Sequence, residues 1–249
     1  MKHVKAIVAV CGLCATASLA SASVTLPAGW DLTMAFGDAR AEWSAAQNPG
    51  TWTATSRPGP NGSPIYRIIG ETYYDGIEMN FDVEFDQDPF VSSSFTVINN
   101  TGVLSPFTVT VTVPIFPPLF APTTMTGSIS GTVGDGDGLV DQFGNGATVM
   151  TQANGRPYYE ALVDGGGVRQ LYPAFQANIA PLNLTSDIDT QNFINEVGPA
   201  VLNTIGIRNS FMLTPGDNAS FTSTFIIVPA PAGIAAAGLV GLVGLRRRR

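Results

Sequence analysis

Cysteine, lysine and histidine are almost missing from this 249-residue chain, since two cysteines, two lysines and one histidine all fall between Met1 and Cys14. The rest of the chain therefore has no thiol nucleophile, no imidazole base and no Schiff-base amine. It also lacks the ligands of an ordinary zinc site. What remains is carboxylate chemistry, oxygen-ligand metals such as calcium, and binding through aromatic surfaces.

Positive charge is scarce as well. Between Ser23 and Val228 the only cations are six arginines, against all 19 acidic residues of the chain. A protein that binds a polyanion needs a basic footprint. The composition therefore argues against nucleic acid as a partner.

The N-terminus has the three parts of a signal peptide. Lys2 and Lys5 precede an apolar stretch from Ala6 to Leu19, and small residues follow at Ala20 and Ala22. This order predicts cleavage after residue 22, a mature chain beginning at Ser23, and export through the secretion machinery. An uncleaved N-terminal anchor is the alternative. Because the mature chain would have no cysteine, its fold cannot depend on disulfides.

The C-terminus has its own three-part order. Val228, Pro229, Ala230 and Pro231 form a stiff extended break, because each proline fixes its own φ and restricts the residue before it. An uncharged apolar run follows from residue 232 to 245. It is shorter than the roughly 20 residues that cross a bilayer comfortably, so it is predicted as a marginal transmembrane helix.

Four arginines end the chain: Arg246, Arg247, Arg248 and Arg249. Positive charge stays on the cytoplasmic side of a membrane. The C-terminus is therefore expected inside, with everything before Val228 outside.

A proline motif, a short apolar helix and a terminal arginine cluster in this order resemble the PEP-CTERM sorting tail of bacteria that export surface polymers. The tail here is residues 228–249, and Ala230 stands where that family has glutamate. The resemblance implies an exosortase-like processing enzyme as a partner, a transient membrane anchor, and final display at the cell surface or in the extracellular matrix. An ordinary C-terminal membrane anchor with a basic flank is the alternative.

The intervening residues 23–227 are long enough for one domain with a real core. Between Gly76 and Phe85, apolar and polar residues alternate strictly, and Phe107 to Val113 repeats the pattern. Alternation predicts strands with one buried and one wet face. The other predicted strands are Thr51–Thr55, Pro64–Ile69, Ser93–Asn99, Met125–Val133, Ala147–Gln152, Tyr158–Val163 and Ser220–Val228.

Many short strands at this spacing predict an all-β, antiparallel β-sandwich of the jelly-roll or immunoglobulin-like kind. The proline-rich stretch from Val113 to Pro122 is predicted to cross between the sheets. One short helix is expected between Thr185 and Val197, with Ser186 or Asp187 as its N-cap.

The first candidate site is a glycine-rich turn that carries Asp135, Asp137 and Asp141. Closely spaced carboxylates can wrap oxygen ligands around calcium. Asp86 and Asp88 could supply further oxygens if the fold brings them near. The alternative is an acidic hairpin turn, because Asp-Gly is the usual chemistry of tight turns.

Two further groups carry a functional and a structural interpretation. Glu78, Asp82 and Glu84 share one strand face, on which neighbours two residues apart lie roughly 7 Å from each other. Glycosidases also use this spacing for paired acids, but a solvated strand face gives the same row. Six aromatic residues could form a sugar-stacking platform or fill the core. They are Trp30, Trp43, Trp52, Tyr158, Tyr159 and Tyr172.

The sequence favours a structural or adhesive protein of the extracellular polymer layer, with no enzymatic activity. A carbohydrate-binding module for surface polysaccharide is the first alternative. A carboxylate-based glycan hydrolase is the second.

Overall fold

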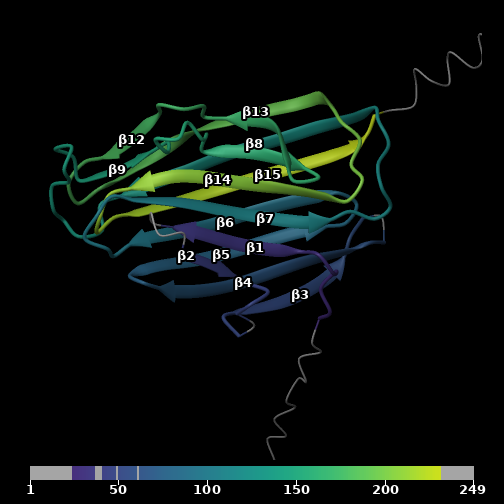
Figure 1. Cartoon of the computed structure of the whole chain (residues 1–249), viewed down its shortest axis with the longest axis horizontal. Helices are drawn as coiled ribbons and strands as arrows, with labels where there is room; N and C mark the ends of the chain where they lie inside the picture. The colour runs from purple at the N-terminus through teal and green to yellow at the C-terminus, as the bar shows by residue number, and fades with distance from the viewer. Residues whose placement is uncertain (1–23, 37–40, 49, 61, 231–249) are drawn as a thin grey trace, which may run out of the picture.

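The computed structural model describes residues 24–36, 41–48, 50–60 and 62–230, and the side chains of residues 41–43 are not described. Ala20, Ala22, Ser23, Pro231 and the arginines 246–249 lie outside the described residues. Within the described ranges the chain forms fifteen strands and no helix (Figure 1). No helix in these ranges therefore has the length and apolarity to cross a bilayer.

The strands follow one another with short connections. In chain order they are β1 (Asp31–Phe36), β2 (Ala41–Ser44), β3 (Trp52–Pro58), β4 (Pro64–Tyr74), β5 (Ile77–Asp86), β6 (Phe90–Asn99), β7 (Ser105–Pro114), β8 (Thr123–Gly134), β9 (Ala147–Met150), β10 (Tyr159–Val163), β11 (Gly166–Leu171), β12 (Ala177–Ala180), β13 (Thr185–Gly198), β14 (Thr204–Leu213) and β15 (Asn218–Pro229).

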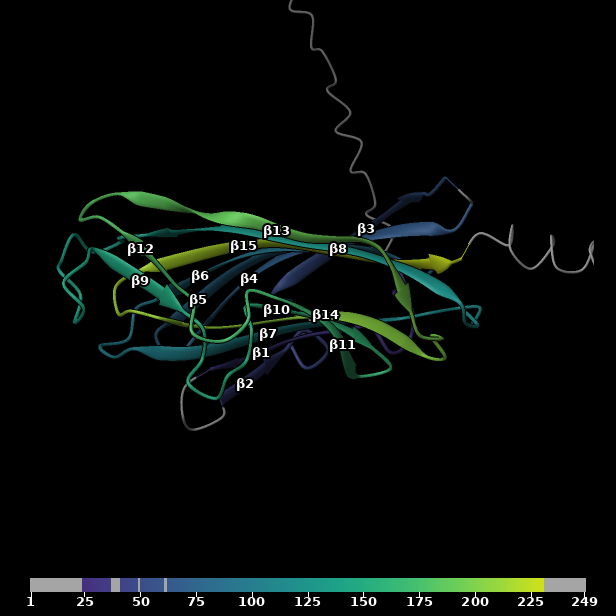
Figure 2. The same ribbon diagram turned by 90° about the horizontal axis from the view of Figure 1, so that it is seen from above.

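These strands form two antiparallel sheets. The seven-stranded sheet has the order β13-β8-β15-β6-β5-β4-β3. The eight-stranded sheet runs β11-β10-β14-β7-β1-β2, and β9 joins it by pairing with both β14 and β12. Figure 2 shows the two sheets as separate layers. The arrangement is consistent with the predicted β-sandwich.

The strict alternation of apolar and polar residues explains why the central strands form and why one face of each strand is buried. In β5, every second residue from Ile77 to Phe85 is buried, while the polar residues between them are partly exposed. In β7, the buried residues Phe107 to Val113 alternate with threonines in the same way. The nine strands predicted from the sequence are all present. Six others, β1, β2, β11, β12, β13 and β14, were not predicted as strands.

The core is a single cluster that draws on both sheets. The ring of Phe211 on β14 lies 5.3 Å from Phe107, 6.3 Å from Phe95 and 4.9 Å from Phe221. Phe95 and Phe221 belong to the opposite sheet, so these rings join the two layers. Offset and tilted ring pairs at such spacings are favourable beyond the area that they bury.

The predicted helix between Thr185 and Val197 is wrong, because this segment is the long edge strand β13. It pairs with β8 along its length, with two register shifts, and Asn195 at one of them has a φ of 55°. The fully buried positions are Ile188, Phe193 and Gly198, five residues apart. Because of the bulges, buried residues in β13 do not recur at every second position, as in a regular strand. Their spacing of five does not match the period of a helix either.

The predicted crossover between the sheets is confirmed. Residues 115–122 lead from β7 in the eight-stranded sheet to β8 in the seven-stranded sheet. Leu119 and Val201 exchange two backbone hydrogen bonds of 2.8 Å, which tie this connection to the one before β14. A second crossover, Thr214 to Asp217, joins β14 to β15. It leads to the first of the two candidate sites.

Candidate functional site

Three carboxylates meet where the chain leaves β8 and enters β15. Gly134 pairs with Asn218 across these strands, which brings Asp135 and Asp137 beside Asp217. One oxygen of each carboxylate lies within 4.8 Å of the others. We call these three residues the acidic cluster.

Asp217 is the buried member of the acidic cluster, with no exposed surface. Its carboxylate accepts a short hydrogen bond from the Thr214 hydroxyl and a longer one of 3.4 Å from the Gly136 N–H. Burial, together with the negative charges of Asp137 and Asp135, raises the pKa of Asp217 to about 6. The pair of hydrogen bonds opposes this rise without cancelling it.

The pKa of Asp135 is shifted in the opposite direction. The backbone N–H of Asn183 donates to its carboxylate at 2.6 Å and that of Gly138 at 2.8 Å. The Asn183 bond is the main reason that the pKa of Asp135 is lowered from its ordinary value. Calcium binds oxygens at about 2.3–2.6 Å, so oxygens that share one ion are at most about 5 Å apart. The spacing of the acidic cluster meets that limit.

Asp141, which the sequence groups with Asp135 and Asp137, has a different role. Its carboxylate accepts hydrogen bonds from the backbone of Phe143 at 2.8 Å and Asn145 at 2.9 Å, and from the Thr148 hydroxyl at 2.5 Å. These bonds close the loop before β9. The third carboxylate beside Asp135 and Asp137 is Asp217.

Asp86 and Asp88 lie at the other end of the sheet. Asp86 pairs with Phe90 at the start of β6, whereas Asn218 pairs with Ile98 near its end. Eight strand residues span about 26 Å. Asp86 instead accepts from the Ser63 hydroxyl at 2.8 Å and from the Asp88 N–H at 3.0 Å.

Sequence reasoning missed Asp217 although a signal was present. It follows Pro215 and Gly216, a turn dipeptide that predicts a reversal before the last strand. That signal places Asp217 in a turn, but it does not say which other turn lies beside it.

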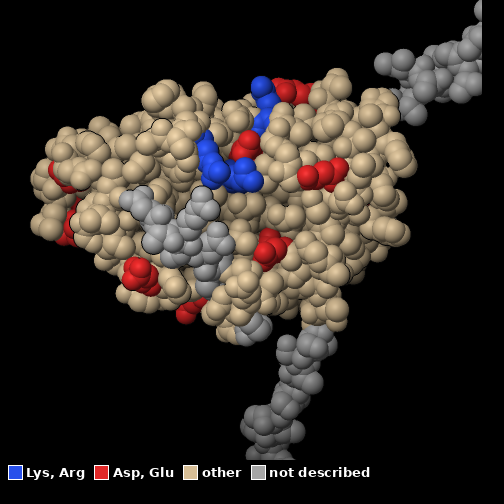
Figure 3. All heavy atoms as spheres, in the orientation of Figure 1, with Lys and Arg blue, Asp and Glu red and all other residues tan. Residues whose placement is uncertain are grey.

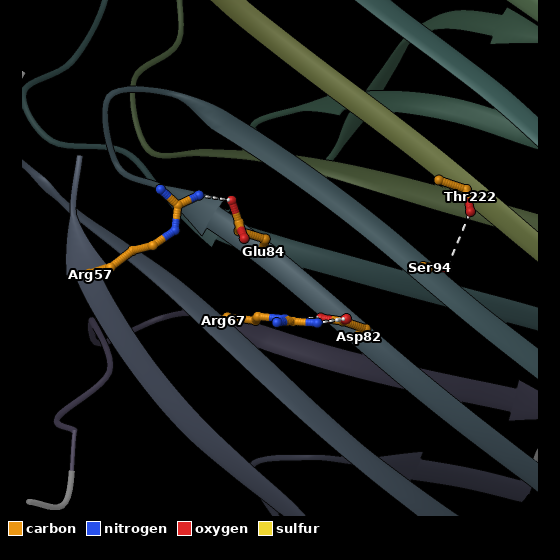
Figure 4. Close-up of polar contacts among 6 residues, drawn as sticks. All are labelled: Arg57, Arg67, Asp82, Glu84, Ser94 and Thr222. Carbon is orange, nitrogen blue, oxygen red and sulfur yellow. Dashed lines mark hydrogen bonds and ion pairs between the residues drawn. The ribbon is translucent and has the colours of Figure 1, made fainter. Parts of the chain in front are cut away.

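The second candidate site is the outer face of the seven-stranded sheet, where serine and threonine side chains pair across strands. The hydroxyls of Thr96 and Ser220 lie 2.7 Å apart, and those of Ser128 and Thr224 lie 2.8 Å apart. Ser94 and Thr222 form a third pair at 3.2 Å (Figure 4). Cross-strand hydroxyl pairs of this kind stabilise a sheet and leave a polar surface.

The carboxylate row of β5 lies on this same face. Asp82 receives two hydrogen bonds from the Arg67 guanidinium, at 2.9 and 2.5 Å, and Arg57 lies 2.6 Å from Glu84 (Figure 4). The hydrogen bond with Asp82 is the main reason that the pKa of Arg67 is raised. Glu78 accepts from the Asn80 amide at 3.2 Å. All three carboxylates of the row therefore have neighbours in the sheet as partners.

The outer face has hollows over both halves of the sheet. A groove of about 510 Å³ lies over β3 to β6, and its polar lining includes Glu71, Asn80, Asp82, Ser94 and Thr96. A second hollow of about 490 Å³ lies over β8, β13 and β15. Hydroxyl, amide and carboxylate groups of this kind can exchange hydrogen bonds with sugar hydroxyls.

The aromatic residues singled out in the sequence lie mainly in the core. Tyr158 and Tyr159 are fully buried, and burial raises the pKa of both phenols. Tyr172 is 5% exposed. The rings of Trp30 and Trp52 meet edge to face at 5.4 Å and pack against the core. The side chain of Trp43 lies outside the described part.

Other aromatic residues are the exposed ones. They include Tyr73 and Tyr74 on β4, Phe116 and Phe120 in the β7–β8 crossover, and Phe175.

Figure 3 shows the charges on one face of the molecule, where acidic side chains are scattered and the basic ones gather at one place beside acidic neighbours. Among the described residues, that face shows no broad basic surface.

Comparisons with known proteins give no family. No protein-family model matches the chain, and no curated protein matches it in sequence. A structure of infectious bursal disease virus, Gx strain, is 11% identical with a TM-score of 0.21, over 85% of this chain and 60% of the viral chain. A likeness at this level carries no argument about function.

Proposed function

We propose that the chain is an exported bacterial surface or matrix protein with a structural or adhesive role in the extracellular polymer layer. A PEP-CTERM-like tail sorts it, a secretion signal exports it, and an exosortase-like enzyme processes it. Its place is outside the cytoplasm, anchored to the membrane at least transiently through the C-terminal apolar run.

The observation that carries this proposal is the order of elements at the C-terminus. The final strand, β15, ends at Pro229. The sequence then continues through Pro231, the apolar run 232–245 and the four terminal arginines. A folded all-β domain is thus followed at once by a short apolar segment with a basic end, which is the order expected of a sorting or anchoring tail.

The test is the intact mass of the protein recovered from the native cell surface, the medium and the membrane fraction. A C-terminus between Pro229 and residue 232 in the released protein is the expected result. A mass that still includes Arg249, found in membranes alone, would make the tail a permanent anchor. Protein found only in the cytoplasm would contradict the proposal.

Binding of a surface polysaccharide is a second proposed function. It is favoured by the groove over β3 to β6, whose lining combines amide, hydroxyl and carboxylate groups with Trp52. Polar groups in a concave surface fix the orientation of a ligand, and apolar lining residues give apolar contact.

The matched test is retention of the full chain on polysaccharide from the native matrix. Asn80→Ala, in the groove, is expected to weaken retention several-fold. Thr110→Ala, on β7 in the other sheet, serves as the control and should leave retention unchanged. Equal retention of all three proteins would exclude the groove as the binding surface. Screening the same preparation for polysaccharide cleavage tests the hydrolase alternative.

A further inference from the structure

One end of the sandwich is apolar and exposed. Phe116 and Phe120, in the crossover between β7 and β8, are 76% and 75% exposed. Val197, near the end of β13, and Leu202, in the connection between β13 and β14, are 84% and 53% exposed. We call these four residues the apolar end. Single exposed apolar residues are ordinary, but four large ones in two linked segments are not.

The two connections that carry the apolar end contain no charged residue. Neither residues 115–122 nor residues 197–203 include Asp, Glu, Lys or Arg. Charged groups beside these segments have partners. Glu196 and Arg169 form an ion pair at 2.9 Å, and the Asp164 carboxylate accepts backbone N–H bonds from residues 202, 203 and 204.

The backbone of the apolar end is fixed and poor in free donors. The N–H of Ile115 donates to the Asn203 carbonyl at 2.8 Å, and Leu119 and Val201 bond to each other in both directions. The crossover also contains Pro117, Pro118 and Pro122, which have no backbone N–H that would need a hydrogen bond after leaving water. Moving this loop into an apolar medium therefore desolvates few unpaired donors.

The C-terminal tail starts beside the apolar end. Pairing of β15 with β8 continues to Pro229 and Thr123, and the N–H of Ala230 donates to the Pro122 carbonyl at 3.0 Å. Figure 1 shows the end of β15 and the crossover into β8 at the same end of the molecule. The apolar run of the tail begins at residue 232, two residues later.

Two residues are a very short tether. Fully extended, they span at most about 7 Å. The headgroup region adds roughly 5–7 Å on each side of the hydrocarbon core. If the run 232–245 enters a bilayer, the domain cannot stand clear of the surface, and the end that carries Pro122 must face the lipid.

We propose that the apolar end contacts a lipid bilayer, with Phe116 and Phe120 in the headgroup region. The inference rests on the proposed membrane attachment of the tail and adds an orientation to it. The apolar end of the sandwich faces the membrane, and the β6–β7 turn at the opposite end points away from it. Aromatic and leucine side chains are the groups that lie in this interfacial layer.

The test labels one cysteine at a time with an environment-sensitive fluorophore. The background is the full chain with Cys11→Ser and Cys14→Ser, which removes both natural thiols. Phe120→Cys places the label at the apolar end. Val103→Cys is the matched control, because Val103 is also an exposed apolar residue, at 64%, in the turn between β6 and β7. Lipid vesicles contain a quencher attached near the headgroup.

The expected result is several-fold stronger quenching at position 120 than at position 103, in protein that co-sediments with the vesicles. Equal, weak quenching in co-sedimenting protein overturns the inference and leaves the tail anchor intact. Failure to co-sediment refutes the membrane attachment itself. A blue-shifted label at position 120 before vesicles are added would show that the tail or a second copy covers the apolar end, which also overturns the inference.

Discussion

Replacing Asp217 by asparagine is expected to stabilise the protein at neutral pH. The buried carboxylate has a folded-state pKa of about 6 against an ordinary value of 3.8. Between these values the folded state binds more protons than the unfolded state, so stability falls as pH rises through this window. The loss is complete above about pH 6. This is the reverse of the usual behaviour of an aspartate in an ion pair.

The magnitude follows from the size of the shift. A difference of about two pH units corresponds to about 3 kcal/mol by linkage. Asp137 is exposed and its charge is screened by water, so about 1–2 kcal/mol is the expected net gain for Asp217→Asn at pH 7.5. At pH 4 the carboxylate is already protonated in the wild-type fold, and the difference should vanish.

The local hydrogen bonds are compatible with an amide at this position. Thr214 accepts from the Thr148 N–H at 2.8 Å and lies 3.0 Å from the Thr148 carbonyl, to which its hydroxyl can donate. A new side-chain N–H could then donate to the Thr214 oxygen, and the amide oxygen could accept from Gly136. The substitution removes a buried charge and keeps its partners.

The assay is urea unfolding of the wild-type and Asp217→Asn proteins between pH 4 and pH 8. Asp88→Asn, an exposed position at the far end of the sheet, controls for the loss of one negative charge. The backbone hydrogen bonds that lower the pKa of Asp135 make stability depend on pH only below about pH 4, which is outside this window. A variant that is less stable than wild type at pH 7.5, or a difference that does not change with pH, would refute the reasoning.

Three further predictions concern the acidic cluster and the core. Millimolar calcium should raise the thermal midpoint of the wild-type protein at pH 7.5, and Asp137→Asn should abolish the rise, because an ion that binds only the folded state stabilises it; an unchanged wild-type melt and no heat of binding would remove the calcium hypothesis. Phe211→Ala should lower the free energy of unfolding by about 3–5 kcal/mol, since it empties a fully buried site between the sheets. Phe175→Ala is the control, because Phe175 is 92% exposed, and it should change the free energy of unfolding by less than about 0.5 kcal/mol. Comparable urea midpoints for the two variants would contradict the described core. Gly70→Ala should cost about 1–3 kcal/mol, because a Cβ there would lie 2.5 Å from the Thr51 carbonyl and 2.6 Å from the Phe81 ring, while Gly102→Ala meets nothing within 4 Å; calorimetry of both variants checks the difference.

The sequence was sufficient for the fold class because alternation is a local property. In Gly76 to Phe85, every second residue is apolar, and a strand with one buried face is the structure that uses this pattern. The same reasoning placed β7, and the prolines that break the pattern after it predicted the crossover. It failed for β13, where bulges spread Ile188 and Phe193 to a spacing that belongs to neither strand nor helix.

The candidate sites depended on tertiary structure, because each joins segments that are far apart in the chain. Asp217 reaches Asp135 and Asp137 only through the pairing of β15 with β8, whereas Asp141, close in sequence, binds the backbone of its own loop. The partners of Asp82 and Glu84 likewise come from other strands: Arg67 lies on the adjacent strand β4, and Arg57 lies on β3, one strand further away.

The chain alone thus determined that strands would form and which faces would be buried, and the order of residues at its two ends predicts an export signal and a sorting tail. Strand pairing within the sheets decided which polar groups share a site, and it placed the crossover with Phe116 and Phe120 beside β15. The physical reason is that residue periodicity acts over a few neighbouring residues, while a site is set by strand order and register, which depend on the whole core.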